Sequence, residues 1–388
     1  MVNSKKVPGS RISALVALQL FSSSLVIGSG SEARQDSWLA LVFALAASLP
    51  LLWLYAAVLR LFPGKGFFDI ALETFGRVGG KIFIALYFFY AVFMGAMVIR
   101  IADDFIQLVN LPQSPEVALL LFSAPLVALQ IRFGGLKDLS SCAKFLLPIV
   151  LIFVGSMFAL GLRFMDVGNI QPVFGSGAKN LSQGTFRMMS VPLGDAVLSL
   201  AFFGEVSPTE KPFRILAGGI LLGGNMLVLG LLRNQLILGA PVCDNYIYAS
   251  YDAVGVINVG EFITRISVFI GVNLILASMA RIGTCVYTAT LGISQILGLK
   301  ESRRLAAPCT LLMAAASFTL YDNLLAGTEA IQCLPLFGVP FQFLLPLLLL
   351  VCGKIKKSRK RRASPAPSAA PPSFSEKERE GADFFRTV

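Results

Sequence analysis

Apolar runs of about 20 residues recur along the whole of this 388-residue chain, and they constrain its fold more than any other feature. The hydrocarbon core of a bilayer is about 30 Å thick, a distance that an α-helix of roughly 20 residues crosses. Transmembrane barrel strands would instead alternate in polarity over about ten residues, a pattern that is not seen. Only 14% of the residues are charged, against about a quarter in soluble domains. The sequence therefore predicts an all-α membrane protein with several spans.

Ten apolar segments have the length and composition of transmembrane helices. Their predicted bounds are 12–30, 38–61, 81–109, 115–131, 145–163, 184–205, 214–239, 265–297, 305–321 and 331–352. The third and the eighth exceed the length that a crossing needs, so we expect them to tilt or to project beyond the bilayer. The chain then divides into an N-terminus at 1–11, a membrane domain at 12–353 and a tail at 354–388.

The placement of Lys and Arg predicts the orientation of the spans. An even number of spans puts both termini on one side, and most basic residues between the spans gather on that side. The opposite side holds only Arg34, Arg163, Lys179, Arg187 and Arg265. By the positive-inside rule, both termini are expected in the cytoplasm. The tail opens with KIKKSRKRR, either a topology signal or a contact for anionic headgroups, and its Pro-, Ala- and Ser-rich remainder is expected to be disordered.

The residue types that most catalytic and metal sites need are scarce. The chain has no histidine, its six cysteines show no CxxC spacing, and no phosphate-binding loop is present. A structural metal, a disulfide framework and a nucleophile paired with histidine are therefore not expected. We predict that the protein is not an enzyme, holds no cofactor and no metal, and contacts a lipid bilayer rather than nucleic acid.

The stretch SVPLGDAVLSL (190–200) places a helix breaker, a glycine and a charge inside the sixth span. Pro192 removes a backbone donor, Gly194 weakens a helix, and Asp195 at a helix centre costs roughly 2.5–3.5 kcal/mol on insertion scales. Irregular backbone is tolerated at membrane depth only where it lines a cavity or is buried in protein. We predict a broken helix that lines a ligand site; the alternative is a proline kink with Asp195 hydrogen-bonded to a neighbouring helix.

The first span is irregular in a similar way. Ser22, Ser23 and Ser24 stand in a row, and the helix-breaking glycines Gly28 and Gly30 follow them. The serines either line the same site or bond back to their own helix. Because the interrupted spans are the first and the sixth of ten, they fit a five-plus-five inverted repeat, whose site lies at the midplane between two broken helices.

Seven stretches of the chain are specific in their order and spacing. They are SEARQDSWLA (31–40), RLFPGKGFFDI (60–70), IADDFIQLVNLPQSP (101–115), VPLGDAVL (191–198), LLRNQLILG (231–239), YDAVGVINVGEFITRISVF (251–269) and YTATLGISQILGLKE (287–301). This set resembles the B, or permease-like, subunit of bacterial spore germinant receptors, within the amino acid–polyamine–organocation transporter superfamily. The chain departs from the usual pattern of that family at Phe21, in place of glycine, and at Leu193-Gly194-Asp195, in place of Phe-Gly-Glu.

The resemblance implies a leucine-transporter-like fold whose site is enclosed by spans one, three, six and eight. The ligand contacts that it implies are Ser22, Ser23 and Ser24, Leu193, Gly194 and Asp195, and Tyr87 or Tyr90, with packing aromatics as the alternative for the two tyrosines. Arg281 lies in the middle of span eight, and related sodium-coupled transporters hold a cation between spans one and eight. We hypothesise that its guanidinium replaces this ion; the alternative is an arginine that reaches the interface along its own stem.

The resemblance also implies a function, a location and partners. The function is that of a sensor subunit, which binds a small nutrient germinant, most simply an amino acid, in the midplane pocket. The partners are an A subunit and a lipoprotein C subunit, in the spore inner membrane. The alternative is a secondary active transporter of amino acids, in which Asp195 would couple transport to protons; a scaffold with a vestigial pocket is a weaker third possibility.

Overall fold

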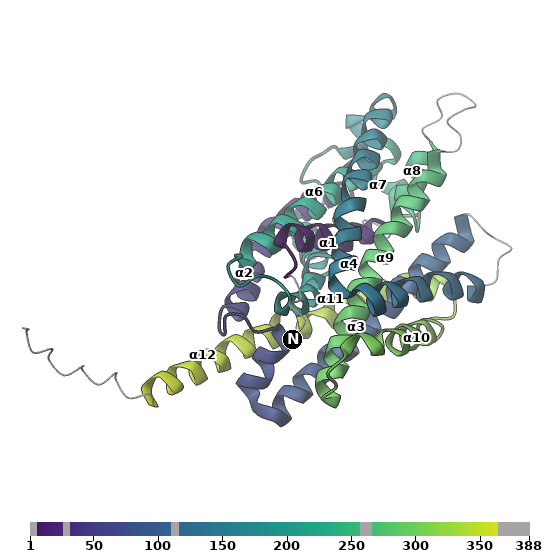
Figure 1. The fold of residues 1–388 in the computed structure, drawn as a ribbon. Helices are drawn as coiled ribbons and strands as arrows, with labels where there is room; N and C mark the ends of the chain where they lie inside the picture. Colours follow the sequence, from purple (N-terminus) through teal and green to yellow (C-terminus); the bar gives the residue numbers. More distant parts are fainter. Residues whose placement is uncertain (1–5, 26–31, 110–115, 257–265, 364–388) are drawn as a thin grey trace, which may run out of the picture.

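The computed structural model describes residues 6–25, 32–109, 116–256 and 266–363. These residues form a bundle of helices, several of which are long, tilted and packed across one another (Figure 1). Among the described residues, β pairing is limited to an isolated bridge between Val7 and Val206. The predicted all-α fold is therefore confirmed for the described part of the chain.

Helical segments coincide with all ten predicted spans. The α-helices are α1 (Gly9–Phe21), α2 (Ser37–Leu59), α3 (Phe67–Val109), α4 (Glu116–Gly161), α5 (Gly177–Ser190), α6 (Pro212–Leu238), α7 (Ala240–Cys243), α8 (Ala249–Gly255), α9 (Ile266–Leu297), α10 (Ala306–Ser317), α11 (Leu324–Val339) and α12 (Leu345–Ala363). The 3₁₀-helices are η1 (Ser22–Leu25), η2 (Arg34–Asp36), η3 (Leu162–Phe164), η4 (Val167–Ile170), η5 (Leu193–Gly204) and η6 (Ser302–Leu305), and η7 (Pro340–Leu344) is a π-helical turn. Among the described residues, seven helical stretches are long and apolar enough to cross a membrane by themselves. The count is lower than ten because α4 contains two spans and because α1 and α10 are short.

The fourth and fifth spans join without a loop, contrary to the boundary that the sequence suggested. The polar segment 132–144 was expected to separate them, but it is helical and belongs to α4. The direction changes at Gly135, whose φ of 61° and ψ of −148° lie outside the helical region. Glycine adopts positive φ without the steric cost of a Cβ, so one residue is enough to turn the chain. Gly76 in α3, with φ of 78°, separates an initial helical segment from the long third span in the same way.

Small residues allow α1 to lie deep in the bundle against α6. A Cβ on Gly219 would come within 2.8 Å of the Ser13 carbonyl oxygen, and one on Gly223 within 2.6 Å of the Ala17 carbonyl oxygen. Such backbone approach between membrane helices is typical of interfaces built from small residues. Because α1 also packs on α4 and α9, nearly all of its residues are buried. The first span is therefore an inner helix of the bundle rather than one that faces lipid.

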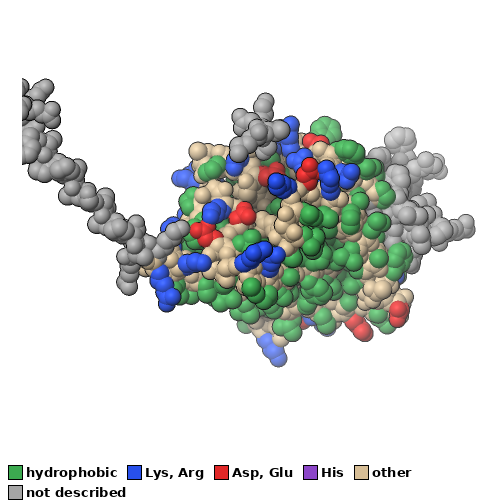
Figure 2. Space-filling model, turned by 60° about the horizontal axis from the view of Figure 1, so that its bottom comes forward, with side chains coloured by type: hydrophobic (Ala, Val, Ile, Leu, Met, Phe, Trp, Pro, Cys, Tyr) green, Lys and Arg blue, Asp and Glu red, His purple; other side chains and the backbone are tan. Residues whose placement is uncertain are grey.

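Large apolar side chains cover much of the outer surface. Phe145, Ile152, Leu325 and Leu336 are each at least 70% exposed. Figure 2 shows a broad apolar area on one face of the molecule, with Lys and Arg side chains gathered beside it. An exposed apolar surface of this extent is expected where a protein contacts lipid.

Helices one and six are both interrupted, as predicted. In span one, α1 ends at Phe21 and the chain continues as the 3₁₀-helix η1. In span six, α5 ends at Ser190, Val191 is extended, and the chain resumes at Leu193 as η5, twelve residues of 3₁₀-helix. Runs of 3₁₀-helix longer than three or four residues are uncommon, and within a helix they often mark a functional hinge. The predicted break residues Gly28 and Gly30 lie outside the described residues.

A third interruption, which the sequence analysis did not predict, lies in span ten. The π-helical turn η7 separates α11 from α12, with Pro340 as its first residue. Proline removes the backbone donor that a regular helix needs, and π-bulges are frequent at functional sites. Beyond the span, α12 continues through the basic run as far as Ala363, so the first ten residues of the predicted tail at 354–388 are helical. The rest of that tail lies outside the described residues.

Candidate functional site

Asp195, at the start of η5, is the centre of a buried polar cluster. Its side chain is 1% exposed. Oδ1 accepts hydrogen bonds from the Tyr90 hydroxyl at 2.6 Å and from Gln342 Nε2 at 3.1 Å. Oδ2 forms an ion pair with the Arg281 guanidinium. A carboxylate is tolerated at this depth only if its lone pairs are satisfied in this way, and the structure supplies three donors.

Arg281 joins the two interrupted helices to span eight. It lies in α9, is 6% exposed, and its Nη1 donates to the Ser23 hydroxyl while its Nη2 contacts Asp195. One guanidinium therefore links η1 of span one to η5 of span six. The side chain is buried among protein partners and does not extend to an interface, which was the alternative interpretation of the sequence.

Side chains from neighbouring helices satisfy the backbone groups that the break in span six frees. Gln19 Nε2 donates to the Asp195 carbonyl at 3.0 Å. The Tyr55 hydroxyl donates to the Gln342 carbonyl at 2.8 Å and also lies 3.3 Å from the Gly194 carbonyl. The Ser199 hydroxyl in turn donates to Gln19 Oε1 at 2.9 Å and fixes the orientation of that amide. Polar partners therefore replace the missing helical hydrogen bonds, as burial requires.

Gly194 leaves the space in which the Gln342 amide lies. A Cβ at this position would be 2.3 Å from Gln342 Oε1, closer than any real contact. Gln342 belongs to η7, and its Oε1 also accepts from the Ser190 hydroxyl at 2.8 Å. The interruption in span ten thus brings an amide into the break of span six. Sequence analysis missed this residue, although a glutamine beside Pro340 in an apolar span was a detectable signal.

The predicted contact residues separate into those that meet at Asp195 and those that do not. Ser23, Tyr90 and Arg281 belong to the cluster. The Ser22 hydroxyl instead bonds back to the Gln19 carbonyl at 2.7 Å, the alternative that the sequence left open. Tyr87 donates to the Phe341 carbonyl at 2.6 Å and packs edge-on against Phe67, so it supports span ten rather than Asp195.

Three other predicted positions need separate mention. Leu193 is completely buried beside the break, and Pro192 directly precedes η5. The side chain of Ser24 lies outside what the structure describes. Gln19 and Tyr55, which hold the broken backbone, were not predicted, because a single polar side chain in an apolar span does not reveal which neighbouring carbonyl it meets.

Polar contacts also tie the N-terminal segment to the end of span six. The Val7 amide donates to the Glu205 carbonyl at 2.9 Å, and the Gly9 amide donates to Glu210 Oε1 at 2.8 Å. Glu205 Oε1 also accepts from the Tyr287 hydroxyl of α9 at 2.6 Å. These bonds hold the N-terminal segment and α9 against the C-terminal end of η5, the end that lies away from Asp195.

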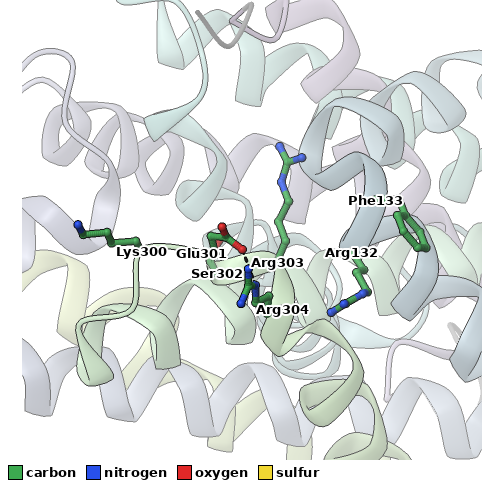
Figure 3. A pocket seen from close by; sticks show the side chains of 7 residues that line it. All are labelled: Arg132, Phe133, Lys300, Glu301, Ser302, Arg303 and Arg304. Atoms are coloured by element: carbon green, nitrogen blue, oxygen red, sulfur yellow. Dashed lines mark ion pairs between the residues drawn. The ribbon is translucent and has the colours of Figure 1, made fainter. Parts of the chain in front are cut away.

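A basic hollow lies at the bend of α4. Arg132 and Phe133 from α4 and residues 300–304 around η6 line a space of about 450 Å³ (Figure 3). It contains four cationic side chains and one carboxylate, Glu301, which pairs with Arg304 at 2.5 Å. All of these residues come from segments that the charge distribution assigned to the side of the termini.

The arrangement defines the class of protein. The nucleobase-cation-symport-1 family transporter Mhp1, closed with bromovinylhydantoin bound, matches with a TM-score of 0.53, at 16% identity and over 99% of both chains. MhsT in complex with L-phenylalanine matches with a TM-score of 0.56, at 9% identity, over 89% of this chain and 98% of that one. The protein is a multi-pass membrane protein with the leucine-transporter fold, in which helices one and six are broken.

Sequence comparison then shows the family. The family described as spore germination protein matches residues 6–323, and the chain belongs to it. Spore germination protein KB of Bacillus subtilis (strain 168) is 24% identical over 348 residues, which cover 88% of this chain and 92% of that protein. Spore germination protein YndE of the same organism is 19% identical over 83% of this chain and 88% of that protein. The resemblance found in the sequence is confirmed.

Proposed function

We propose that this protein is the germinant-sensing membrane subunit of a spore germination receptor, and that it binds a small molecule at Asp195. The observation that carries the proposal is that one buried carboxylate, on span six, receives side chains from spans one, three, eight and ten, either directly or through Arg281. A charge held between two interrupted helices at the centre of a bundle is a functional candidate by default in a membrane protein. Membership of the germination family supports the role.

The chemistry of the pair favours an amino acid as the ligand. A free amino acid carries an ammonium and a carboxylate on neighbouring atoms. The ammonium would compete with Arg281 for Asp195, while the carboxylate would take the guanidinium that is released. Binding would then exchange an internal ion pair for two ion pairs with the ligand. Because Arg281 also contacts Ser23, the exchange would alter the link between spans one and six. The ligand would thereby favour one of two conformations of the protein, which differ in how these spans are linked.

Arg281 would also take the place of a coupling cation. Its guanidinium contacts η1 from α9, so a fixed positive charge lies between spans one and eight. Arginine keeps its proton under all ordinary conditions and cannot leave the site. A sensor built in this way would respond to its ligand without sodium.

The family and the distribution of charged residues support a location, partners and an orientation for the protein. We propose the spore inner membrane as the location, with A and C subunits of the receptor as partners and with no enzymatic reaction. The basic hollow at the α4 bend and the contacts of the N-terminal segment with the loop after span six support cytoplasmic termini.

The decisive experiment measures germination in spores that carry variants of this chain. Asp195→Asn and Ser23→Leu are expected to abolish the response to amino acids, and each response is compared with wild type at equal receptor abundance. Thr310→Ala is the matched control, because Thr310 is equally buried but, within the part of the chain that the structure describes, its hydroxyl bonds to its own helix at the Ala306 carbonyl. A normal response in both test variants would refute the site.

Secondary transport is the second candidate, because the proteins of like fold include transporters and because a buried carboxylate can carry a proton. Uptake of labelled amino acid into proteoliposomes distinguishes the two. Uptake that disappears in Asp195→Asn supports transport, and ligand binding without uptake supports the sensor.

A further inference from the structure

A small cavity lies away from Asp195, near the C-terminal end of α6 and the N-terminal end of α9, and its mostly apolar lining includes Arg233, Ser250 and Asn273. Its volume is about 30 Å³, and α1, α4, α6, α8 and α9 contribute to its lining. A cavity needs roughly 10–15 Å³ to hold one water-sized guest, so this one admits a single small guest and not an amino acid. We propose that it is a binding site for one halide ion, with chloride as the physiological candidate.

The first reason is the charge of Arg233, which lines the cavity and is 6% exposed. Its partners are neutral: Asn234 Oδ1 accepts at 2.6 Å and 3.2 Å, and the Ser250 carbonyl accepts at 3.2 Å. Within the described ranges, no carboxylate pairs with this guanidinium and Nη1 makes no hydrogen bond. A buried cation whose partners are all neutral is costly, and it is stabilised most by an anion. Through the Ser250 carbonyl, Arg233 contacts the short helix α8.

The second reason is Asn273, on the other side of the cavity. This residue is 6% exposed, and its Oδ1 is completely buried without a hydrogen-bond partner in the part of the chain that the structure describes. The oxygen and the nitrogen of an amide exchange places by a half-turn of the side chain, and their assignment rests on the hydrogen bonds they make. With its NH₂ turned inward, Asn273 would donate to an anion that Arg233 holds. The same cavity is therefore lined by a buried arginine that has only neutral partners among the described residues and by a buried amide whose oxygen has none there.

The rest of the lining selects the kind of anion. Phe21, Val154 and Leu274 present apolar surface to the cavity, and this surface favours an ion that gives up its water readily. Phosphate and carboxylate ligands are too large for the space and too strongly hydrated for the apolar walls. A water molecule would satisfy Asn273 but would leave the charge of Arg233 uncompensated. A halide ion meets both requirements.

The site is connected to the first helix. Phe21 is the last residue of α1, directly before the break that carries Ser23. A bound halide would support the position of Phe21 and thereby the end of α1. Halide binding is therefore expected to stabilise the protein whether or not an amino acid is present, and this expectation does not depend on the function proposed above.

Thermal unfolding of the purified full-length protein in lipid nanodiscs tests the site. Sodium chloride, bromide and gluconate are compared at equal ionic strength. Chloride and bromide are expected to raise the midpoint temperature of unfolding until the effect saturates at high salt concentration. Gluconate is expected to have no effect on this temperature. In Arg233→Gln the halide dependence should disappear. Arg187→Gln is the control, because that arginine is only partly buried and is already paired with Glu32 at 2.9 Å.

A second variant covers the case in which Arg233→Gln does not fold. Asn273→Leu fills the cavity and is expected to weaken the apparent halide affinity at least tenfold. Its midpoint temperature of unfolding in sodium gluconate should stay close to that of the wild type. The proposal is overturned if the wild-type midpoint is the same in all three salts. It is overturned equally if Asn273→Leu retains the wild-type halide affinity.

Discussion

Removing one member of the Asp195–Arg281 pair should destabilise the protein more than removing both. In Asp195→Asn, Arg281 keeps the Ser23 hydroxyl but loses its counter-ion in a position where it is 6% exposed. In Arg281→Met, Asp195 keeps Tyr90 and Gln342 as donors but loses the only cation that contacts it in the described part of the chain. Breaking a buried ion pair in this way lowers the free energy of unfolding by about 3–5 kcal/mol, because the remaining buried charge has no counter-ion.

The double variant leaves neither charge. Replacing a buried ion pair with neutral groups of similar size is often close to neutral for stability. The two single losses sum to about 6–10 kcal/mol, so a double variant near wild-type stability implies a coupling energy of several kcal/mol. The Asn side chain can still accept from Tyr90, and Met fills much of the space of the arginine stem. The expected order of stability is therefore wild type, then the double variant, then either single variant.

Equilibrium unfolding in mixed micelles, with increasing denaturing detergent, measures the four proteins of this cycle. Helical content by circular dichroism is the signal, and the same four proteins are assayed for amino acid binding. We expect the double variant to be stable but unable to bind, because both charges that a zwitterion needs are absent. Loss of stability in the double variant equal to the sum of the single losses, within about 0.5 kcal/mol, would show that the two residues do not interact.

Three further predictions concern the same cluster. Gly194→Ala should abolish the ligand response, because its Cβ would displace the Gln342 amide. Gly155→Ala, whose Cβ would have nothing within 4 Å, should leave the response intact, and germination assays on both variants check this. Tyr90→Phe should lower stability by about 1.5–3 kcal/mol, since it removes a hydrogen bond to a charged group, and should weaken ligand binding; Tyr87→Phe should lower stability by less, through a neutral bond, and preserve binding. Replacing sodium with choline should leave ligand binding to the purified receptor unchanged, and a strict sodium requirement would contradict the role of the buried guanidinium.

Several features of the fold were predictable because they depend on local chemistry. The spans follow from the lengths of the apolar runs, and the break in span six follows from Pro192 and Gly194, which weaken any helix in which they occur. Asp195 was predictable as a candidate site residue because a carboxylate at the centre of a span is costly wherever its partners lie. None of these inferences required knowledge of which helices are neighbours.

Other features depended on packing and could not be read from the chain. The continuous path of α4 depends on one glycine, Gly135, that turns the helix where a polar loop was expected. The choice between Tyr87 and Tyr90 depends on the rotation of α3 relative to η5. The contribution of Gln342 requires the π-helical turn in span ten, and its position only makes sense beside the space that Gly194 leaves.

The sequence by itself determined that this chain crosses a membrane many times, that span six is interrupted at Pro192 and Gly194, and that a carboxylate and a guanidinium lie within membrane spans. These properties belong to individual segments, because the transfer energies of side chains and the hydrogen bonds of the backbone are local quantities. The tertiary structure decided that Asp195 and Arg281 pair with each other, that Ser23, Tyr90 and Gln342 complete the cluster, and that Arg233 is left with neutral partners among the described residues. Those facts depend on how helices distant in the sequence pack, since a buried charge is stabilised by whichever partner the packed bundle brings within a few ångströms.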